Sequence, residues 1–325
     1  MSPWIRAAAL PLLLALAASP ATAQTPPERE IAAPGPKGPL AGTLIPPARG
    51  KPVVLMLPGS GPTDRDGNNR LGVQAGSTRL LAQALAVRGI GSVRIDKRGL
   101  FGSAAAISDP NAVTIADYAD DVHQWIRVIR AKTGARCIWV LGHSEGGLIA
   151  LKAAQAPEGI CGLVLLAAAG RPLGTLLREQ LAAAALPPEM LAQADAGFAR
   201  LERGEPVDAA AMPPVLLPLF APAVQGFLID QMALDPAVLA RAYRGAVLIV
   251  SGTNDVQAVA ADAKALHRAR PDATLLEVPR MTHALKQAES DGRAASLATY
   301  RDPALPLAPG LVEGIAAFVL QHSPR

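Results

Sequence analysis

The chain has 325 residues, 50% apolar and 18% charged, which is enough to bury one large core and excludes disorder of the whole protein. Its formal net charge of +4 is spread over 31 basic and 27 acidic residues without a long basic run, so we expect no nucleic-acid partner. Aromatic residues make up only 3% of the chain, which argues against a groove that stacks sugars or bases.

The N-terminus is typical of a signal peptide. A short basic start, MSPWIR, precedes the apolar stretch AAALPLLLALAA and a small-residue cleavage site that ends at Ala23. We expect residues 1–23 to be removed and the protein to be exported to the periplasm or the medium. The alternative is an uncleaved anchor, but the apolar stretch is short and contains Pro11. No later apolar stretch is long enough to cross a bilayer, so we expect no stable membrane anchor.

Strand and helix patterns alternate after this leader. Strands are expected in REIAAPGPKGPLAGTLIPP, KPVVLMLP, IGSVRID, CIWVLGH and GLVLLAAAG, and helices in STRLLAQALAVRG, VTIADYADDVHQWIRVIRAKTG and GLIALKAAQA. The alternation predicts an α/β protein with a mostly parallel sheet covered by helices on both faces.

The alternation stops at Arg171. Residues 171–244 contain helical stretches and no strand pattern, after which GAVLIVSG, VAADAKALHRA, TLLEVP and PGLVEGIAAFVL restore the strand–helix order. The expected organisation is a first core part over residues 24–170, a helical cap insertion over 171–244 and a second core part over 245–325.

The motif GHSEGG fits the nucleophile-elbow pattern G-x-S-x-G, because an apolar strand directly precedes it and a helix directly follows. Gly142 and Gly146 lack a β-carbon, so the helix can pack close behind the strand while Ser144 projects at the carboxyl end of the sheet. Ser144 is therefore the predicted nucleophile, and a tight structural turn is the alternative.

A serine hydroxyl needs a base, and His283 is the histidine that lies in a loop just beyond a strand. His143 precedes the serine and is expected to point away from it, and the other three histidines lie in helices or the C-terminal tail. The acid that orients His283 is expected at the end of the strand between the insertion and His283, where VSGTNDVQ places Asp255. The alternative for Asp255 is a turn or helix-capping role.

The oxyanion of the reaction requires backbone N–H donors. We expect one from Glu145, which follows the nucleophile, and one from Ser60 in the loop LPGSGP, with Gly59 or Gly61 as alternatives. The nearby DRDGNN starts like a calcium loop but has Asn and Ala where that loop needs Gly and Glu, so we expect no metal and no cofactor. Its aspartates are expected to brace the oxyanion loop.

The chain resembles the α/β-hydrolase superfamily from LPGSGP to the closing helix, and within it a group of exported bacterial serine hydrolases with the landmarks LPGSGPTDRDGN, DKRGLFGS, GHSEGG, GTNDVQ and MTHALK. The resemblance implies carboxylic-ester hydrolysis and an eight-stranded core with a cap inserted after the sixth strand. Pro58 and Gly59 replace the usual His-Gly of the oxyanion loop, a departure that this group shares.

The predicted activity is hydrolysis of small-molecule esters with small, fairly apolar acyl groups. The insertion offers PPVLLPLFAP and GFLID as lining for an acyl pocket, with Leu219 and Phe220 as specificity residues. A serine peptidase or amidase with the same triad is the alternative, and a non-catalytic binding protein of this fold is a third reading.

The two cysteines are expected to form a disulfide. Export places the chain where such a bond persists, and Cys137 and Cys161 each begin one of two consecutive strands, which are usually neighbours in the sheet. Two free buried thiols are the alternative.

Overall fold

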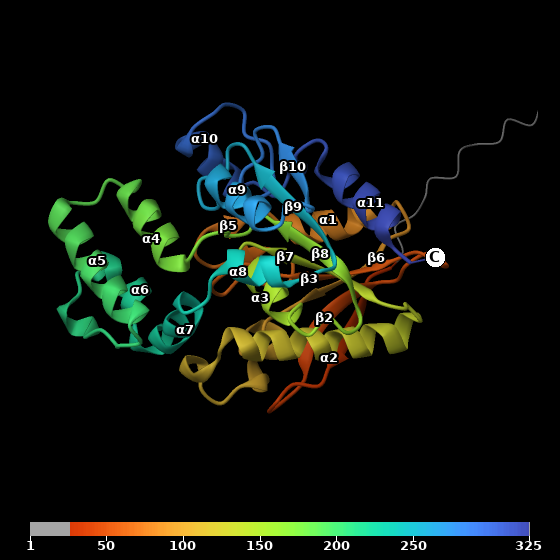
Figure 1. Cartoon of the computed structure of the whole chain (residues 1–325), viewed down its shortest axis with the longest axis horizontal. Coiled ribbons are helices and arrows are strands. Elements are labelled where there is room, and N and C mark those ends of the chain that lie inside the picture. Colours follow the sequence, from red (N-terminus) through yellow and green to blue (C-terminus); the bar gives the residue numbers. More distant parts are fainter. Residues whose placement is uncertain (1–26, 325) are drawn as a thin grey trace, which may run out of the picture.

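The computed structural model describes residues 27–324 and contains an eight-stranded sheet (Figure 1). The signal peptide expected over residues 1–23 lies outside the described residues. The strands run in the order β1-β2-β6-β3-β7-β8-β9-β10. Their bounds are β1 Arg29–Ala33, β2 Leu40–Ile45, β3 Val53–Leu57, β6 Gly91–Ile95, β7 Ile138–His143, β8 Ile160–Leu166, β9 Ala246–Gly252 and β10 Thr274–Val278.

Six of these strands, from β6 to β10 in the sheet order, are parallel, while β2 pairs antiparallel with both β1 and β6. All residues of β3 and β6 are buried, as expected for strands covered on both faces. Parallel strands end at the same edge, so the loops after β3, β7, β9 and β10 meet there.

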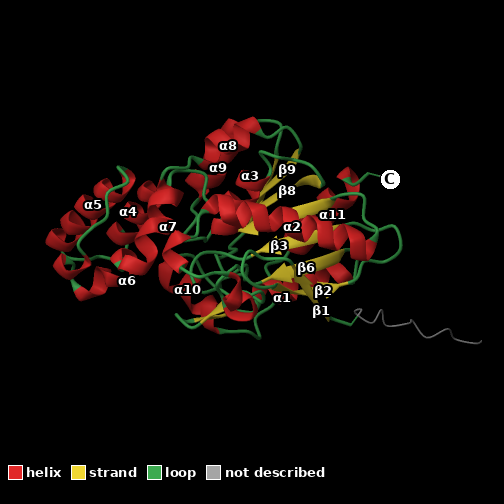
Figure 2. Cartoon of the chain, turned by 90° about the horizontal axis from the view of Figure 1, so that it is seen from below, coloured by secondary structure: helices red, strands yellow, loops and turns green. Residues whose placement is uncertain are grey.

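Helices cover both faces of the sheet (Figure 2). One face packs against α2 Ile115–Thr133, α3 Glu145–Ala153 and α9 Ala260–Ala269, and the other against α1 Ser77–Ala86 and α11 Leu311–His322. The long helix α2 starts at a capping box formed by Thr114 and Asp117 and ends at Gly134, whose φ of 72° is favourable only for glycine. The smaller elements are β4 Asn68–Asn69, β5 Val73–Gln74 and α10 Arg293–Ala298.

Five helices lie between β8 and β9, and the first four form the cap, the green to teal region that projects from the carboxyl edge of the sheet in Figure 1. The cap helices are α4 Leu173–Ala182, α5 Pro188–Glu202, α6 Leu217–Phe220 and α7 Pro222–Met232. The fifth helix, α8 Pro236–Ala242, packs on the core beside α3 and α9. The cap has its own apolar core around Phe198 and Phe220, whose ring centroids lie 5.2 Å apart. The predicted mostly parallel sheet with a helical cap after its sixth strand is confirmed.

No single helix among residues 27–324 combines the length and the apolar character needed to cross a membrane. The pair Pro214–Phe220 and Pro222–Met232 meets that requirement only when both parts are counted together, and it is bent by 58°.

Hydrogen bonds join the cap to the core along a seam between α7 and the start of α2. The carboxylate of Asp230 accepts a hydrogen bond from the backbone N–H of Ile115 at 2.7 Å, and the side-chain oxygen of Asn111 accepts from the N–H of Gly226 at 2.8 Å. At the first residues of the cap, the guanidinium of Arg171 pairs with buried Asp262 of α9 at 3.0 Å. The cap is therefore fixed to the core on two sides.

The predicted disulfide is confirmed. Cys137 and Cys161 are bonded, with their α-carbons 5.1 Å apart. Cys161 is the extra residue at an irregularity in the pairing of β7 with β8, between the pairs Ile138–Ile160 and Trp139–Gly162. The bond lies at the amino ends of these strands, while Ser144 follows β7 at its carboxyl end.

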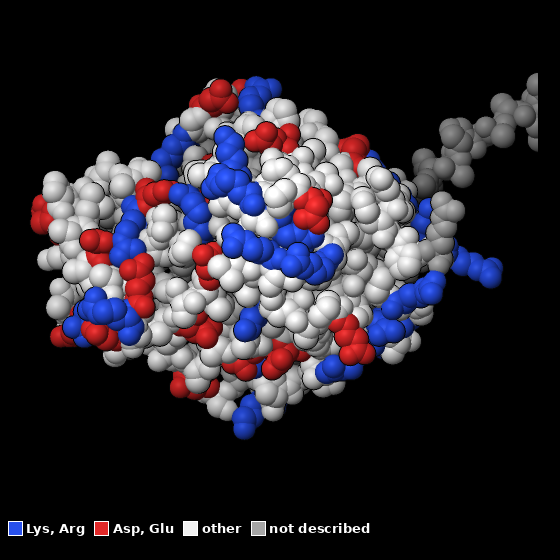
Figure 3. Space-filling model, in the orientation of Figure 1, with Lys and Arg blue, Asp and Glu red and all other residues white. Residues whose placement is uncertain are grey.

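Basic and acidic side chains intermingle over the face of the molecule shown in Figure 3. Many of them form surface ion pairs, such as Arg178 with Asp195 and Glu202 on the cap.

Candidate active site

Ser144 occupies a strained turn between β7 and α3. Its φ of 55° and ψ of −121° are rarely adopted by a residue with a side chain, a conformation that costs about 1–3 kcal/mol. A β-carbon on Gly142 would lie 2.0 Å from the carbonyl oxygen of Gly146, and one on Gly146 would lie 2.6 Å from that of Leu57. Only glycine fits at either position, so the two glycines permit the close packing of α3 that the sequence motif predicts.

Asp255 and His283 form a buried hydrogen-bonded pair. Asp255 follows β9, His283 lies beyond β10, and the Nδ1 atom of His283 is 2.8 Å from Oδ2 of Asp255. The other carboxylate oxygen, Oδ1, accepts from the N–H groups of Gln257 at 2.8 Å and Ala258 at 3.0 Å. These bonds hold the carboxylate in one orientation. Because the carboxylate is an acceptor, we assign the imidazole proton to Nδ1, which leaves Nε2 free to accept a proton.

His143, which was expected only to point away from Ser144, supports the backbone of the His283 loop. Its Nε2 atom lies 3.0 Å from the carbonyl oxygen of His283, and the two rings are 4.8 Å apart. Burial, followed by the adjacent His283, lowers the pKa of His143 from 6.5 to about 3, so its ring is neutral at physiological pH. The position of His143 next to Ser144 in the sequence does not predict its contact with the His283 backbone.

The loop after β3 passes directly beside Ser144. A β-carbon on Gly59 would lie 3.2 Å from the β-carbon of Ser144, closer than ordinary packing allows. Ser60, the next residue, lines the cavity in front of the serine. No protein atom among residues 27–324 accepts a hydrogen bond from the backbone N–H of Ser60 or of Glu145. Both predicted oxyanion donors are thus unpaired and lie near Ser144.

Asp64 and Asp66 hold the turn that follows this loop. Contrary to the expectation, neither carboxylate among the described residues bonds to residues 58–61, and the side-chain bond from the turn to the loop comes from Thr63. The carboxylate of Asp64 accepts from the N–H groups of Asp66 and Asn68 at 2.9 and 2.8 Å, and Asp66 forms an ion pair with buried Arg94 at 3.2 Å. The hydroxyl of Thr63 donates to the carbonyl oxygen of Ser60 at 2.9 Å.

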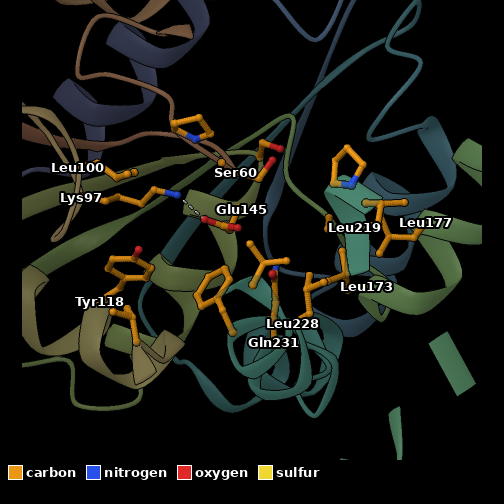
Figure 4. Close-up of a pocket in the computed structure, with 18 of the residues that line it drawn as sticks. Ser60, Lys97, Leu100, Tyr118, Glu145, Leu173, Leu177, Leu219, Leu228 and Gln231 are labelled. Carbon is orange, nitrogen blue, oxygen red and sulfur yellow. Dashed lines mark hydrogen bonds and ion pairs between the residues drawn. The ribbon is translucent and has the colours of Figure 1, made fainter. Parts of the chain in front are cut away.

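A buried ion pair between Lys97 and Glu145, which sequence reasoning missed, lies next to the serine (Figure 4). The Nζ atom of Lys97 is 2.6 Å from Oε1 of Glu145 and 2.9 Å from the carbonyl oxygen of Gly59. Both side chains are only 4% exposed. The residues are 48 positions apart, and β3 separates their strands in the sheet, so no local motif indicates the contact.

Two cavities meet at Ser144 and His283. The larger, of about 440 Å³, lies beneath the cap and is lined mainly by apolar side chains, among them Leu173, Leu177, Leu219, Phe227 and Leu228 (Figure 4). The smaller, of about 80 Å³, lies on the other side of the serine and is lined by polar side chains that include Thr78, Asn69 and Tyr300.

The cap residues Leu219 and Phe220 differ in position. Leu219 lines the larger cavity as expected, whereas Phe220 is fully buried in the cap's own core. The interpretation of Phe220 as a pocket residue is wrong, because the sidedness of a four-residue helix flanked by prolines cannot be read from its sequence.

The described residues 27–324 contain no cluster of three or more His, Cys, Asp or Glu side chains arranged to hold a metal ion.

Comparison with known proteins supports a hydrolase. No curated protein sequence matches the chain. Proline iminopeptidase from Mycobacterium smegmatis has a TM-score of 0.56 at 16% identity, and the match covers 90% of this chain and 98% of that protein. The esterase Pf2001 of Pyrococcus furiosus has a TM-score of 0.55 at 12% identity, covering 91% and 92%. Est1E of Butyrivibrio proteoclasticus has a TM-score of 0.54 at 16% identity, covering 90% and 98%.

These likenesses establish the α/β-hydrolase fold, and the family follows from the sequence. A family model described as serine aminopeptidase, S33, matches residues 68–291, which is more than half of the 325 residues. The matched range includes Ser144, Asp255 and His283. The chain therefore belongs to the S33 serine aminopeptidase family of α/β hydrolases.

Proposed function

We propose that this hydrolase cleaves carboxylic esters of small, fairly apolar acyl groups, with Ser144 as nucleophile, His283 as base and Asp255 as the acid that orients it. The observation that carries the proposal is the position of Ser144 and the His283–Asp255 pair at the mouth of a cavity of about 440 Å³ with a mainly apolar lining. An apolar acyl chain is stabilised in such a cavity by the surface it removes from water.

In the proposed reaction, Oγ of Ser144 attacks the ester carbonyl carbon while Nε2 of His283 takes the hydroxyl proton. The carbonyl oxygen becomes an oxyanion that accepts hydrogen bonds from the N–H groups of Ser60 and Glu145. The bond to the alcohol oxygen then breaks as His283 returns the proton to that oxygen, leaving an acyl-enzyme. Water, activated by the same histidine, attacks the acyl carbon and releases the carboxylic acid and free Ser144.

The charges around the larger cavity favour an ester over the N-terminal end of a peptide. An aminopeptidase must receive an ammonium group beside the scissile bond, for which a free carboxylate is the natural partner. Among the described residues, Glu145 is the only carboxylate that lines this cavity, and Lys97 engages it at 2.6 Å. The remaining cation of the lining, Arg98, is paired with Asp121 at 2.7 Å.

The description of the family makes peptide or amide hydrolysis the second candidate, and a non-catalytic binding role the third. Among the similar structures, Pf2001 is described as an esterase and Est1E has been solved with ferulic acid bound, whereas the mycobacterial protein is a proline iminopeptidase.

Three measurements separate these candidates. Labelling by a fluorophosphonate that is lost in Ser144→Ala distinguishes an active serine hydrolase from a binding protein. A series of p-nitrophenyl esters from acetate to octanoate, run beside aminoacyl-p-nitroanilides, distinguishes the two enzymes. Faster turnover of anilides than of every ester would contradict the proposal.

We also propose export with cleavage after Ala23. The disulfide between Cys137 and Cys161 supports it, because such bonds persist in oxidising compartments. N-terminal sequencing of the protein recovered from periplasm and medium tests the site, and a full-length chain that remains in the membrane fraction would refute it.

A further inference from the structure

The ammonium group of Lys97 joins the two backbone segments that carry the proposed oxyanion donors. One acceptor is the carbonyl oxygen of Gly59, at 2.9 Å, and the other is Oε1 of Glu145, at 2.6 Å. The side chain is 4% exposed, and its Nζ atom also lies 5.4 Å from the centre of the Tyr118 ring. Figure 4 shows the lysine, one of the residues that line the larger cavity, extending toward Glu145.

The first contact fixes the direction of an N–H group. The carbonyl of Gly59 and the N–H of Ser60 belong to one peptide group, and the described chain has no cis peptide bond. In a planar trans peptide these two groups point in opposite directions. The bond from Lys97 to the Gly59 oxygen therefore turns the N–H of Ser60 to the opposite side, where it has no protein acceptor among residues 27–324.

The second contact holds the other donor. Glu145 is the first residue of α3, and its own N–H is free of intrahelical partners. Its side chain is anchored by Lys97, which ties the start of α3 to the loop after β3 through one buried cation. One side chain, from the segment after β6, therefore contacts both backbone segments that carry the proposed donors.

We propose that Lys97 is a positioning residue of the oxyanion hole, which acts by holding the Ser60 and Glu145 N–H groups at the separation that the transition state requires. The inference rests on the proposed hydrolase function. It extends the site to a residue that contacts neither the nucleophile nor the base. An oxyanion hole is effective because its donors are oriented before the reaction, so loosening one peptide group lowers kcat without removing any donor.

The test compares two variants that both lack the Glu145 carboxylate, so that removing Lys97 leaves no buried anion unpaired. Lys97→Met alone would leave the Glu145 carboxylate without its partner, which is strongly destabilising. We therefore use Glu145→Gln as the reference, since it keeps the backbone N–H and removes the charge. In the reference, Lys97 keeps the Gly59 carbonyl oxygen as an acceptor. Lys97→Met/Glu145→Gln then differs from the reference only by the lysine. Lys132→Met, on the exposed last turn of α2, is the matched control in the wild-type background.

The readouts are kcat and KM for the best p-nitrophenyl ester, the dissociation constant of an alkyl boronic acid, and the rate of fluorophosphonate labelling. A boronic acid forms a tetrahedral adduct on the serine, so its affinity reports the donors directly. Relative to Glu145→Gln, we expect the kcat of the double variant to be lower by about 10-fold to 100-fold. This is a smaller decrease than the removal of a whole oxyanion donor causes. KM should change less than about threefold, and boronic acid affinity should fall in step with kcat. Lys132→Met should match the wild type.

Several results would overturn the inference. One is a double variant whose kcat and labelling rate stay within twofold of the reference. A second is a lower kcat with unchanged boronic acid affinity, which would indicate a general structural role. A third is a rise in KM alone, which would indicate that Lys97 binds substrate. Thermal melting of all variants confirms that each is folded.

Failure of the proposed function is recognised separately. If the wild type cleaves anilides rather than esters, the same comparison is made on anilides. If it turns over neither, the boronic acid and fluorophosphonate measurements still report on Lys97.

Discussion

Removing the disulfide should weaken the fold without affecting catalysis. The residues Cys137 and Cys161 are 24 positions apart, so the bond closes a short loop that contains β7 and α3. In the chain-entropy model a loop of this length stabilises the folded state by about 3.5 kcal/mol at 25 °C. With an unfolding entropy of about 2.1 cal/mol/K per residue over the described chain, this corresponds to a melting temperature lower by about 6 °C.

The perturbation is the double variant Cys137→Ala/Cys161→Ala, measured by urea unfolding and by thermal melting beside the oxidised wild type. The six residues of β7 place the bond about 20 Å from Ser144, so kcat should remain within twofold. A loss of less than about 1 kcal/mol would refute the chain-entropy reasoning. A large drop in kcat would refute the claim that the bond is purely structural. Alkylation of the untreated, denatured protein should add no alkyl groups.

Three further predictions follow from the site. Ser144→Ala and His283→Ala should each lower ester turnover by about 10⁴-fold or more with unchanged melting temperature, and near-normal activity in either would refute the assignment. Leu219→Ala should shift the acyl-length preference toward longer chains in the p-nitrophenyl series, and an unchanged preference in this variant would mean that the cap only covers the site. Phe220→Ala should instead lower the free energy of unfolding in urea by about 3–5 kcal/mol. The pKa of His143 is about 3 in the folded protein and 6.5 in the unfolded chain, so between these pH values the unfolded chain binds one more proton. The free energy of unfolding therefore decreases as the pH is lowered below 6.5, by about 2 kcal/mol from pH 7 to pH 5. His143→Gln should lack that part of the pH dependence, and equal slopes in the two proteins would contradict it.

The alternation of strands and helices along the chain and the elbow were predictable because their causes are local. The stretch before Ser144 is an apolar strand, and Gly142 and Gly146 follow a spacing that only close strand–helix packing explains. The adjacency of β7 and β8, which brings Cys137 near Cys161, follows from the rule that consecutive parallel strands are usually neighbours.

Contacts that depend on the order of distant strands could not be predicted in this way. Lys97 follows β6 and Glu145 follows β7, and they meet only because β3 inserts between those strands and its loop passes beneath both side chains. The contact of His143 with the His283 backbone depends on the loop after β10, which bends back toward β7. Each is a long-range contact between a predicted site residue, Glu145 or His283, and a residue for which the sequence indicates no such contact, Lys97 or His143.

The seam between α7 and the start of α2 borders the larger cavity, since residues of both line it. Opening the cap along this seam breaks the bond from the Ile115 N–H to the carboxylate of Asp230, which is worth about 1.5–3 kcal/mol. It would also break the bond from the N–H of Gly226 to Asn111, so we expect open molecules to be a small minority of the population. Opening along this seam would also leave the N–H of Ile115, the first residue of α2, without an acceptor, and for bulky esters we expect the frequency of that opening to limit turnover before the chemistry does.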